Sequence, residues 1–407
     1  MSVRESSPDE ATERILKALT ATSFLIFFSG YIVAPLIPAL SLEFDATQYR
    51  TGWVVPAYLI PYGISTLFYG TLSDRFGRKQ MLILLLFLSA LMNLASGMAW
   101  SIDSLIAIRF LAGLGSGGVV TVALALVADM YPYEKLGRPM GWMFGAIAGG
   151  MAFGSTLGAW LNPYIGWRNE FRVIFILTLI LLFYIVRLRH QIKEKVGVAL
   201  SLRDILKGYR SLIGSSRGLR TYSFVLLNGI FHGGVFAWLG TYLTQRYQLD
   251  DAGIGRTLLG YGIPGMFLGP IIGRLADRYG RRRLIPLGML LAAICALALA
   301  PSIPLWSVTI FITLLSVGLD MSHPLMAGIV ASLDPKLRGQ AMGLNTFAIF
   351  IGLGTGSIIF QNIMLVGFTT AFLGFGLLQF ILSLLAFKAF ASEKSAHLTN
   401  AIKPVTV

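Results

Sequence analysis

The sequence predicts an all-α integral membrane protein of twelve transmembrane helices, arranged as two pseudo-symmetric six-helix bundles. Three observations lead to this fold class. Hydrophobic residues make up 55% of the 407-residue chain and charged residues only 13%; long apolar runs follow one another almost from end to end; and one short basic loop occurs twice. A hydrocarbon core about 30 Å thick requires roughly 20 apolar residues in a helix. The alternation typical of a β-barrel is absent, so helices are the expected spanning elements.

The apolar runs define six expected spans in each half of the chain. The first run follows a polar, acidic N-terminal stretch and is too long for the core of a signal peptide, so we expect it to be retained as the first span. The single cysteine, Cys295, lies inside an apolar run, which excludes an internal disulfide and favours a packing function. The spans begin near Lys17, Gly52, Met81, Ser104, Met140, Arg172, Thr221, Gly255, Leu284, Leu305, Met342 and Phe368.

Basic residues are distributed unevenly over the expected loops. If the N-terminus is inside, external segments carry five of the 33 Lys and Arg residues and one lies within a span, which leaves 27 in cytoplasmic segments. This is the positive-inside pattern, and it predicts a multi-pass protein of the inner (plasma) membrane with both termini cytoplasmic. Attraction to anionic headgroups accounts for the net charge of +14, so we expect membrane lipid and no nucleic acid as a partner. The external residues are Arg50, Arg168, Arg172, Arg246 and Arg256.

The longest polar stretch divides the chain into two halves. We expect an N-terminal six-helix bundle over residues 1–186, a cytoplasmic basic linker over 187–220, and a C-terminal six-helix bundle over 221–407. Within the linker, four apolar residues are spaced as in an amphipathic helix on the inner surface. The linker either only joins the bundles or has a regulatory or partner-binding function. The four residues are Ile205, Leu206, Tyr209 and Leu212.

The two halves resemble copies of each other. The strings GTLSDRFGRK, from Gly70 to Lys79, and GRLADRYGRR, from Gly273 to Arg282, match in register, and their aspartates, Asp74 and Asp277, are 203 residues apart. A second set of matching residues, separated by 202 positions, indicates together with the first match that the chain contains an internal repeat. It relates Gly141, Gly150 and Gly154 to Gly343, Gly352 and Gly356.

The repeated loop combines residue types that suit a conformational latch. Gly70 permits close helix approach, Gly77 permits a sharp turn, and Asp74 is placed to cap a neighbouring helix and to pair with Arg78. A topology anchor would explain the basic residues alone, but not the repeated Gly and Asp. We predict a cluster of Asp74, Arg78 and Asp129 that forms in one state and breaks in another. Its weaker counterparts in the second half are Gly273, Asp277 and Arg281.

The loop resembles the G-x-L-a-D-r-x-G-r-k signature of the major facilitator superfamily, and the resemblance covers the whole chain. The string RFLAGLGSGG, which begins at Arg109, is similar to that superfamily's arginine motif in span four, which in proton-coupled members implies proton transfer. Outward snorkelling of Arg109 is the alternative. Span five resembles the antiporter motif of the twelve-span drug:proton branch, although Ser155 and Ala159 replace its usual Pro and Gly. Its glycines could instead serve close helix packing alone. They are Gly141, Gly150, Gly154 and Gly158.

One acidic residue, Asp320, lies deep within an expected span. A buried carboxylate can exchange protons near neutral pH, which makes Asp320 the best proton-site candidate. His323 lies on the same helical face at i to i+3 spacing, and His232 could join them. Alternatively, Asp320 satisfies backbone groups freed by the kink at Pro324, and His232 is a hydrogen-bonded packing residue.

Polar and aromatic residues of several spans are candidates to line a substrate cavity. Their neighbours are mainly apolar, which favours a lipophilic or amphipathic solute, although aromatic rings at span ends also form interface belts. The cavity candidates are Tyr58, Tyr62, Asn228, Trp238, Tyr242, Tyr261, Asn345 and Gln361.

The sequence therefore predicts a secondary active transporter that moves a small lipophilic or amphipathic solute by alternating access, with proton-coupled efflux (antiport) as the expected mode. We expect it to function as a monomer with a small-molecule substrate and protons. The alternatives are a sugar or metabolite symporter or uniporter, and a lipid flippase. No enzyme, cofactor or metal site is expected. The glycines that match GxGxxG (from Gly113) and GxSxG (from Gly214) follow no strand, so neither string indicates a nucleotide site or a catalytic serine.

Overall fold

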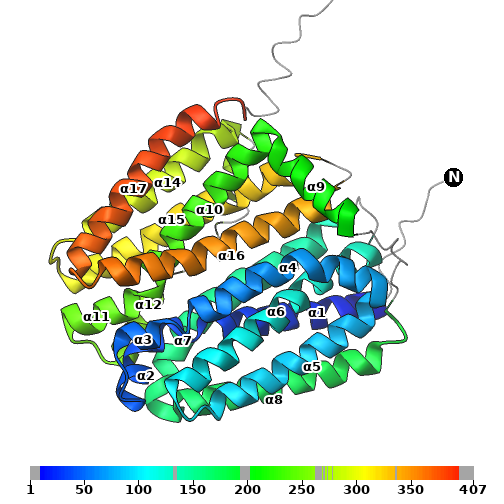
Figure 1. Ribbon diagram of the computed structural model, residues 1–407, viewed down its shortest axis with the longest axis horizontal. Helices are drawn as coiled ribbons and strands as arrows, with labels where there is room; N and C mark the ends of the chain where they lie inside the picture. The colour runs from blue at the N-terminus through cyan, green and yellow to red at the C-terminus, as the bar shows by residue number, and fades with distance from the viewer. Residues whose placement is uncertain are drawn as a thin grey trace, which may run out of the picture.

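The computed structural model is helical throughout the residues it describes, which are 10–131, 135–192, 202–261, 268, 271–272, 274–276, 278–334 and 337–393. The predicted all-α fold class is confirmed. Figure 1 shows the N-terminal helices packed together in one bundle and the C-terminal helices in a second bundle beside it. Within the described residues, nine helical segments are long and apolar enough to cross a membrane.

The long helices correspond to the expected spans. In the N-terminal half they are α1 (Glu10–Tyr31), α4 (Pro56–Phe76), α5 (Arg78–Gly97), α6 (Ile102–Met130), α7 (Gly137–Ile165) and α8 (Trp167–Leu188). In the C-terminal half they are α10 (Ser216–Ala237), α14 (Arg281–Ala298), α15 (Leu305–Val330), α16 (Arg338–Ile363) and α17 (Phe368–Ala389). Shorter helices are η1 (Ala34–Leu36), α2 (Ile37–Glu43), α3 (Gln48–Gly52), α9 (Leu202–Gly214), α11 (Leu239–Tyr247) and α12 (Asp251–Leu258).

Three of the twelve expected spans are not among the nine apolar segments, for identifiable reasons. Helix α4 is less apolar because it includes residues such as Tyr58, Tyr62 and Ser65. Helix α14 has 18 residues, and its first turn is a run of three arginines that begins at Arg281. The span expected near Gly255 continues into residues outside the described part of the chain.

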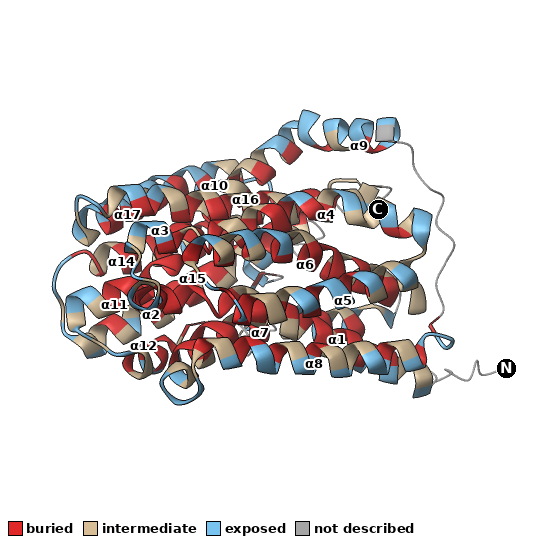
Figure 2. Ribbon diagram, turned by 60° about the horizontal axis from the view of Figure 1, so that its bottom comes forward, coloured by how far each residue is buried: buried red, intermediate tan, exposed pale blue. Residues whose placement is uncertain are grey.

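The outer faces of both bundles carry large apolar side chains. Phe183 is 68% exposed, Trp142 59% and Leu385 54%. Figure 2 shows this pattern as exposed and intermediate residues along the outer faces of the helices, with buried residues toward the centre. Apolar surface of this extent suits hydrocarbon rather than water as the solvent.

Glycine contacts relate the two bundles residue by residue. In the first bundle, α7 packs on α1, and a Cβ added at Gly154 would lie 2.5 Å from the carbonyl oxygen of Phe28. In the second, α16 packs on α10, and a Cβ at Gly356 would overlap the carbonyl oxygen of Ile230. Phe28 and Ile230 are 202 residues apart, the same offset as their glycines. The predicted repeat is thus a repeat of helix contacts.

The neighbouring glycine pair repeats this relationship. A Cβ at Gly150 would overlap the carbonyl oxygen of Phe24, and a Cβ at Gly352 would lie 2.5 Å from that of Leu226. These partners are again 202 residues apart. Because a side chain larger than hydrogen cannot fit at such contacts, glycine is required for the close approach of the two helices.

The two bundles meet most closely at one end of the molecule. We call the end with Arg78 and Arg338 the basic end, and the opposite end, with Trp167 and Pro304, the far end. Among the described residues, four side-chain hydrogen bonds join the bundles at the far end. They are Asn162 Nδ2 to Asp251 Oδ2 (2.7 Å), Gln245 Nε2 to Gln48 Oε1 (2.6 Å), Thr156 Oγ1 to the Leu258 carbonyl (3.2 Å), and Gln361 Nε2 to the Tyr49 carbonyl.

Small residues tighten the same end. The indole ring of Trp238 lies against Gly52, and the backbone of Pro35 lies against Gly240, where an added Cβ would come within 2.8 Å of the proline carbonyl oxygen. Trp238 has no exposed surface. The far end is therefore sealed between the bundles in this conformer.

Fewer hydrogen bonds between the halves of the chain are described toward the basic end. Thr66 Oγ1 donates to the Gly343 carbonyl at 3.4 Å, and Tyr209 Oη, on α9, donates to the Leu67 carbonyl at 3.1 Å. The second bond comes from the helix between the bundles rather than from either bundle. Contact at this end depends partly on α9, which Figure 1 shows beside α16 and α4.

Candidate functional site

Aromatic rings from both bundles meet partway along the spanning segments, which for the first and seventh spans run over Glu10–Glu43 and Ser216–Tyr247. Tyr62 of α4 stacks on Phe350 of α16 with ring centroids 4.1 Å apart, and Tyr31 at the end of α1 lies 5.6 Å from Phe236 of α10. Phe236 in turn stacks on Tyr261 at 4.7 Å. This is the expected depth for a substrate site between repeated halves.

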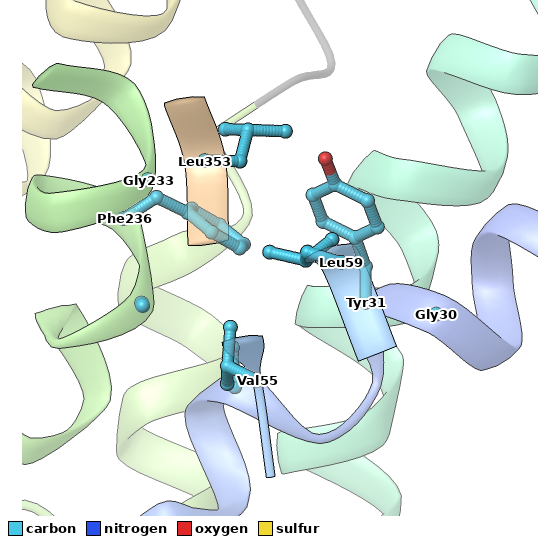
Figure 3. Close-up of a pocket in the computed structure, with 9 residues that line it drawn as sticks. Gly30, Tyr31, Val55, Leu59, Gly233, Phe236 and Leu353 are labelled. Atoms are coloured by element: carbon cyan, nitrogen blue, oxygen red, sulfur yellow. The ribbon is translucent and has the colours of Figure 1, made fainter. Parts of the chain in front are cut away.

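A small cavity lies within this interface. Figure 3 shows its apolar lining, with Tyr31 and Leu59 facing Phe236 and Leu353. Its volume is about 20 Å³, which is room for about one water molecule. The Tyr31 hydroxyl is buried and has no hydrogen-bond partner among the described residues. The interface between the bundles is thus closed around a small residual space in this conformer.

Four candidate residues lie beside this interface. Asp320, His323 and His232 were predicted for proton exchange, and Tyr261 for the substrate cavity. The rings of His232 on α10 and His323 on α15 have centroids 6.0 Å apart, and the Tyr261 hydroxyl is hydrogen-bonded to His232 Nε2. Asp320 lies one turn before His323 on α15. The structure therefore brings the three predicted titratable residues, Asp320, His323 and His232, into one region of the C-terminal bundle.

Two polar atoms of this group lack partners. Asp320 Oδ2 and His323 Nε2 are buried without a hydrogen bond among the described residues. A buried polar group without a partner costs about 1–3 kcal/mol, and more when it is charged. Such atoms are available to a proton, a water molecule or a solute group that enters the interface.

Arg109 belongs to a separate site in the N-terminal bundle. Its side chain is 1% exposed, so the alternative that it snorkels outward is wrong. Nη1 donates to the Ser29 carbonyl at 3.0 Å and Nη2 to the Gly30 carbonyl at 2.8 Å, and the guanidinium lies 4.1 Å from the ring centre of Tyr58. Arg109 thus binds the last carbonyls of α1 just before that helix breaks.

The predicted latch residues of the first half lie together. Arg78 Nε donates to Asp74 Oδ1 at 2.9 Å, Arg78 Nη1 lies 2.6 Å from Asp129 Oδ2, and the same nitrogen donates to the Ala125 carbonyl at 3.0 Å. The chain turns into α5 at Gly77, whose φ of 89° favours glycine. The cluster joins the start of α5 to the end of α6, and Gly70 has open space beside it.

The second copy of the loop is only partly described. Gly273 and Asp277 lie outside the described residues. Gly280, the counterpart of Gly77, also has a positive φ, 83°, so the turn before the next helix repeats. The Arg281 guanidinium lies over Gly328 of α15, where an added Cβ would be 3.2 Å from Nη2.

The glycines of the antiporter-like motif differ in their surroundings. Gly150 and Gly154 contact α1 as described above, and Gly158 contacts Ile32 near the break in that helix. Gly141 has nothing within 4 Å. The motif therefore fixes the separation of α7 and α1 over three of its four glycines.

The cavity candidates fall into two groups. Tyr62 and Tyr261 lie at the interface between the bundles, as the contacts above show, whereas Tyr58 packs on Arg109 within the N-terminal bundle. Trp238 lies at the far end of the interface, and its Nε1 donates to the Ser357 carbonyl at 3.0 Å. Gln361 also lies at the far-end seal. Apart from Tyr58, these residues occupy the surfaces that separate if the bundles move apart.

The other candidates lie within the C-terminal bundle in this conformer. Asn228 has no exposed surface; its Nδ2 donates to Ser322 Oγ at 3.0 Å and its Oδ1 accepts from Gln379 Nε2 at 2.7 Å. Tyr242 donates to the Leu299 carbonyl at 3.0 Å. Asn345 is 3% exposed, and its Oδ1 lacks a partner among the described residues.

Sequence reasoning missed two residues of these networks. Gln379, deep in the last span, completes the amide network of Asn228, and its position in an apolar run was the available signal. Tyr31, which lines the central cavity, precedes Pro35 and Pro38, which mark the break in the first span.

Comparison with known proteins agrees with this architecture. The family model for the Major Facilitator Superfamily matches residues 19–267 and 225–405. The chain belongs to the major facilitator superfamily. It is 28% identical over 371 residues, 89% of this chain and 92% of the other, to the uncharacterized MFS-type transporter YceJ of Bacillus subtilis (strain 168).

Two further superfamily members differ in their described cargo. Multidrug resistance protein 3 of Bacillus subtilis (strain 168) is 24% identical over 379 residues, which cover 79% of this chain and 73% of that protein. The crystal structure of a D-xylose-proton symporter superimposes with a TM-score of 0.74 at 16% identity, over 92% of this chain and 97% of that one. The structural likeness establishes the shared fold and no substrate.

Proposed function

We propose that this superfamily member is a secondary active transporter that exports a small lipophilic or amphipathic solute by proton-coupled antiport. The observation that carries the proposal is the group formed by Asp320, His323 and His232, with unpartnered buried atoms, beside the interface where the two bundles meet. A transporter that moves its halves about such a site can couple solute binding to proton binding.

Alternating access supplies the mechanism. The far-end seal is closed, and the positive-inside pattern assigns the basic end to the cytoplasm, so this conformer is the one closed to the outside. Opening the far end requires Trp238 to leave Gly52 and the four far-end hydrogen bonds to break. The cluster of Asp74, Arg78 and Asp129 acts as a latch within the N-terminal bundle whose stability biases this exchange.

Proton exchange at Asp320 provides the coupling. When the carboxyl is protonated it is neutral and tolerates the closed, apolar interface; when it is ionised it favours a conformer that admits water or a cationic group of the solute. His323 lies one turn after Asp320, and its ring centroid is 6.0 Å from that of His232, so the two imidazoles are the candidates to relay the proton. The hydrogen bond with the Tyr261 hydroxyl orients the His232 ring. Arg109 acts at a distance by holding the end of α1, which borders the central cavity.

The proton gradient is sufficient for this work. One proton that moves down about 100 mV and about one pH unit yields roughly 3.7 kcal/mol, enough for a several-hundred-fold solute gradient. The aromatic interface of Tyr62, Phe350 and Phe236 favours a lipophilic body in the solute, and the multidrug relative favours the same class. The likeness to a sugar symporter keeps a sugar or metabolite symporter or uniporter as the second candidate.

The wider arrangement follows from the same proposal. Residues 1–186 and 221–407 are the two moving bundles, and residues 187–220 are the cytoplasmic linker. The protein functions as a monomer in the inner (plasma) membrane with both termini cytoplasmic, needs no cofactor, and is not an enzyme. A lipid flippase of the same fold remains an alternative that the choice of transported solute distinguishes.

A ligand screen followed by flux measurements tests the proposal. Thermal shifts of the purified protein across drugs, sugars, amino acids and lipid analogues identify the solute class. We expect lipophilic compounds to stabilise the protein, and addition of the best compound to proteoliposomes to release protons in proportion to its uptake. Proton flux that ignores the compound would refute coupling, and movement of lipid analogues alone would favour a flippase.

A further inference from the structure

One face of the linker helix α9 packs against the rest of the protein. Ile205 is 6% exposed and Leu212 3%, and Gly208 lies against the side-chain amide of Gln340 on α16. Tyr209 reaches the Leu67 carbonyl of α4. This face therefore docks on both halves of the molecule.

A second apolar stripe on α9 remains uncovered. Leu206 is 67% exposed and Ile213 40%. At 100° per residue these two side chains lie within about 20° of each other and beside the docked face. Three exposed basic residues continue around the helix from this stripe: Arg203, Lys207 and Arg210. The order around the helix is thus docked face, apolar stripe, basic edge.

The position of α9 matches the boundary of the bilayer. Gly208 of α9 lies against Gln340, two residues after the spanning helix α16 begins at Arg338. One residue separates α9 from the spanning helix α10, whose N-cap, Ser215, accepts a hydrogen bond from Gly218 N at 3.0 Å. Figure 2 shows α9 at the margin of the molecule rather than among the spans. Since α9 is level with the first turns of two spanning helices, this is the level at which a headgroup layer is expected.

We infer that α9 docks on the surface of the membrane itself, with the stripe of Leu206 and Ile213 inserted at the boundary of the acyl chains and the basic edge bound to anionic lipid headgroups. An apolar stripe beside a row of cations is the composition that binds an anionic interface. The choice of lipid over a protein partner rests on this charge complementarity and on the level of α9. The inference does not depend on which solute is transported.

Nitroxide labels on the full-length protein test this inference in vesicles. The cysteine at 295 is buried, so a cysteine at an exposed position is labelled selectively. One label replaces Leu206 on the stripe, and a matched label replaces Ser211, an exposed polar position of the same helix. Collision rates with oxygen, which partitions into lipid, and with a water-soluble nickel chelate report depth at each position.

The expected result depends on lipid charge. In vesicles that contain phosphatidylglycerol, the label at 206 becomes more accessible to oxygen than to nickel, while the label at 211 stays accessible to nickel. In phosphatidylcholine vesicles the difference shrinks. Replacing Arg203, Lys207 and Arg210 by Gln lowers the ratio of inserted to free α9 by roughly a hundredfold, since each cation contributes about fivefold. An unchanged melting temperature of this variant shows that its fold is intact.

Three outcomes would overturn the inference. Equal nickel accessibility at 206 and 211 in phosphatidylglycerol vesicles means that the stripe faces water. Loss of access to both reagents at 206 means that a protein, including a second copy of this chain, covers it. Insertion that is independent of phosphatidylglycerol and of the three basic residues excludes anionic lipid as the ligand.

Discussion

Replacing Gly52 by Ala should open the far end of the molecule. A Cβ at this position would overlap the Trp238 ring and lie 3.0 Å from Gln361 Oε1. The ring cannot retreat easily, because it has no exposed surface and its Nε1 is bonded to the Ser357 carbonyl at 3.0 Å. Overpacking of this kind costs about 1–3 kcal/mol.

The cost falls on the closed conformer alone, because Gly52 and Trp238 belong to different halves of the chain and separate when the far end opens. A cost of about 1–3 kcal/mol changes the ratio of open to closed molecules by roughly five- to 150-fold. Alanine also favours the helical backbone of α3 relative to glycine, but this effect acts on both conformers equally.

Thiol labelling measures the shift. Val55 lines the central cavity and is 8% exposed, so Val55→Cys should react with an impermeant maleimide only when the far end opens. We expect Gly52→Ala to raise its labelling rate at least fivefold, whereas Gly141→Ala, where nothing lies within 4 Å, leaves the rate unchanged. An unchanged rate in Gly52→Ala, or an equal rise in both variants, would refute the assignment of the far-end seal.

Three further variants test separate contacts. Asp129→Asn removes the charge of a side chain that is 8% exposed and lies 2.6 Å from Arg78. The maximal transport rate should therefore fall about tenfold or more, while KM for the solute stays unchanged. A change in KM alone would contradict a latch. In Arg109→Lys, the lysine cannot bind both carbonyl oxygens of α1, so the free energy of unfolding, measured by thermal unfolding, should fall by about 1.5–3 kcal/mol. Wild-type stability of this variant would contradict the assignment of both hydrogen bonds to the Arg109 guanidinium. Burial alone would raise the pKa of the Glu393 carboxyl, but the hydrogen bonds and charges of Arg217 and Arg220 outweigh it and hold that pKa below its usual range. The resulting stabilisation is present above the unfolded pKa of about 4.3 and is lost as the pH falls through the folded pKa. The melting temperature of wild type should therefore exceed that of Glu393→Gln at pH 7, and the two melting temperatures should converge on acidification. A difference that widens in acid would contradict the lowered pKa of Glu393.

The sequence was informative where composition and spacing alone determine structure. The length of the apolar runs predicted the spans, because hydrocarbon thickness sets a minimum helix length. The repeat at an offset of 202 predicted equivalent helix contacts, because glycine at a close crossing has no substitute. Asp74 and Arg78 are only four residues apart, on either side of the turn at Gly77, so their ion pair needed only local geometry.

Contacts between distant segments were harder to predict. Position along its span left open whether Arg109 turns outward, and only the break in α1 reveals the two carbonyls that it binds. Asn228 was predicted to line a cavity, but in this conformer its amide bonds to Ser322 and Gln379, both more than 90 residues away in sequence. Which polar groups face a cavity depends on the rotation of each helix, which hydrophobic periodicity does not fix when a helix is apolar on all sides.

The most direct test of proton-coupled transport is a comparison of two modes of flux in proteoliposomes that contain wild type or Asp320→Asn. Solute exchange without a gradient requires alternating access only, whereas accumulation driven by a pH gradient also requires proton binding. The account predicts that Asp320→Asn retains exchange and loses gradient-driven accumulation. Accumulation at the wild-type level in Asp320→Asn would contradict the account, because the protein would then couple protons through another group or not at all.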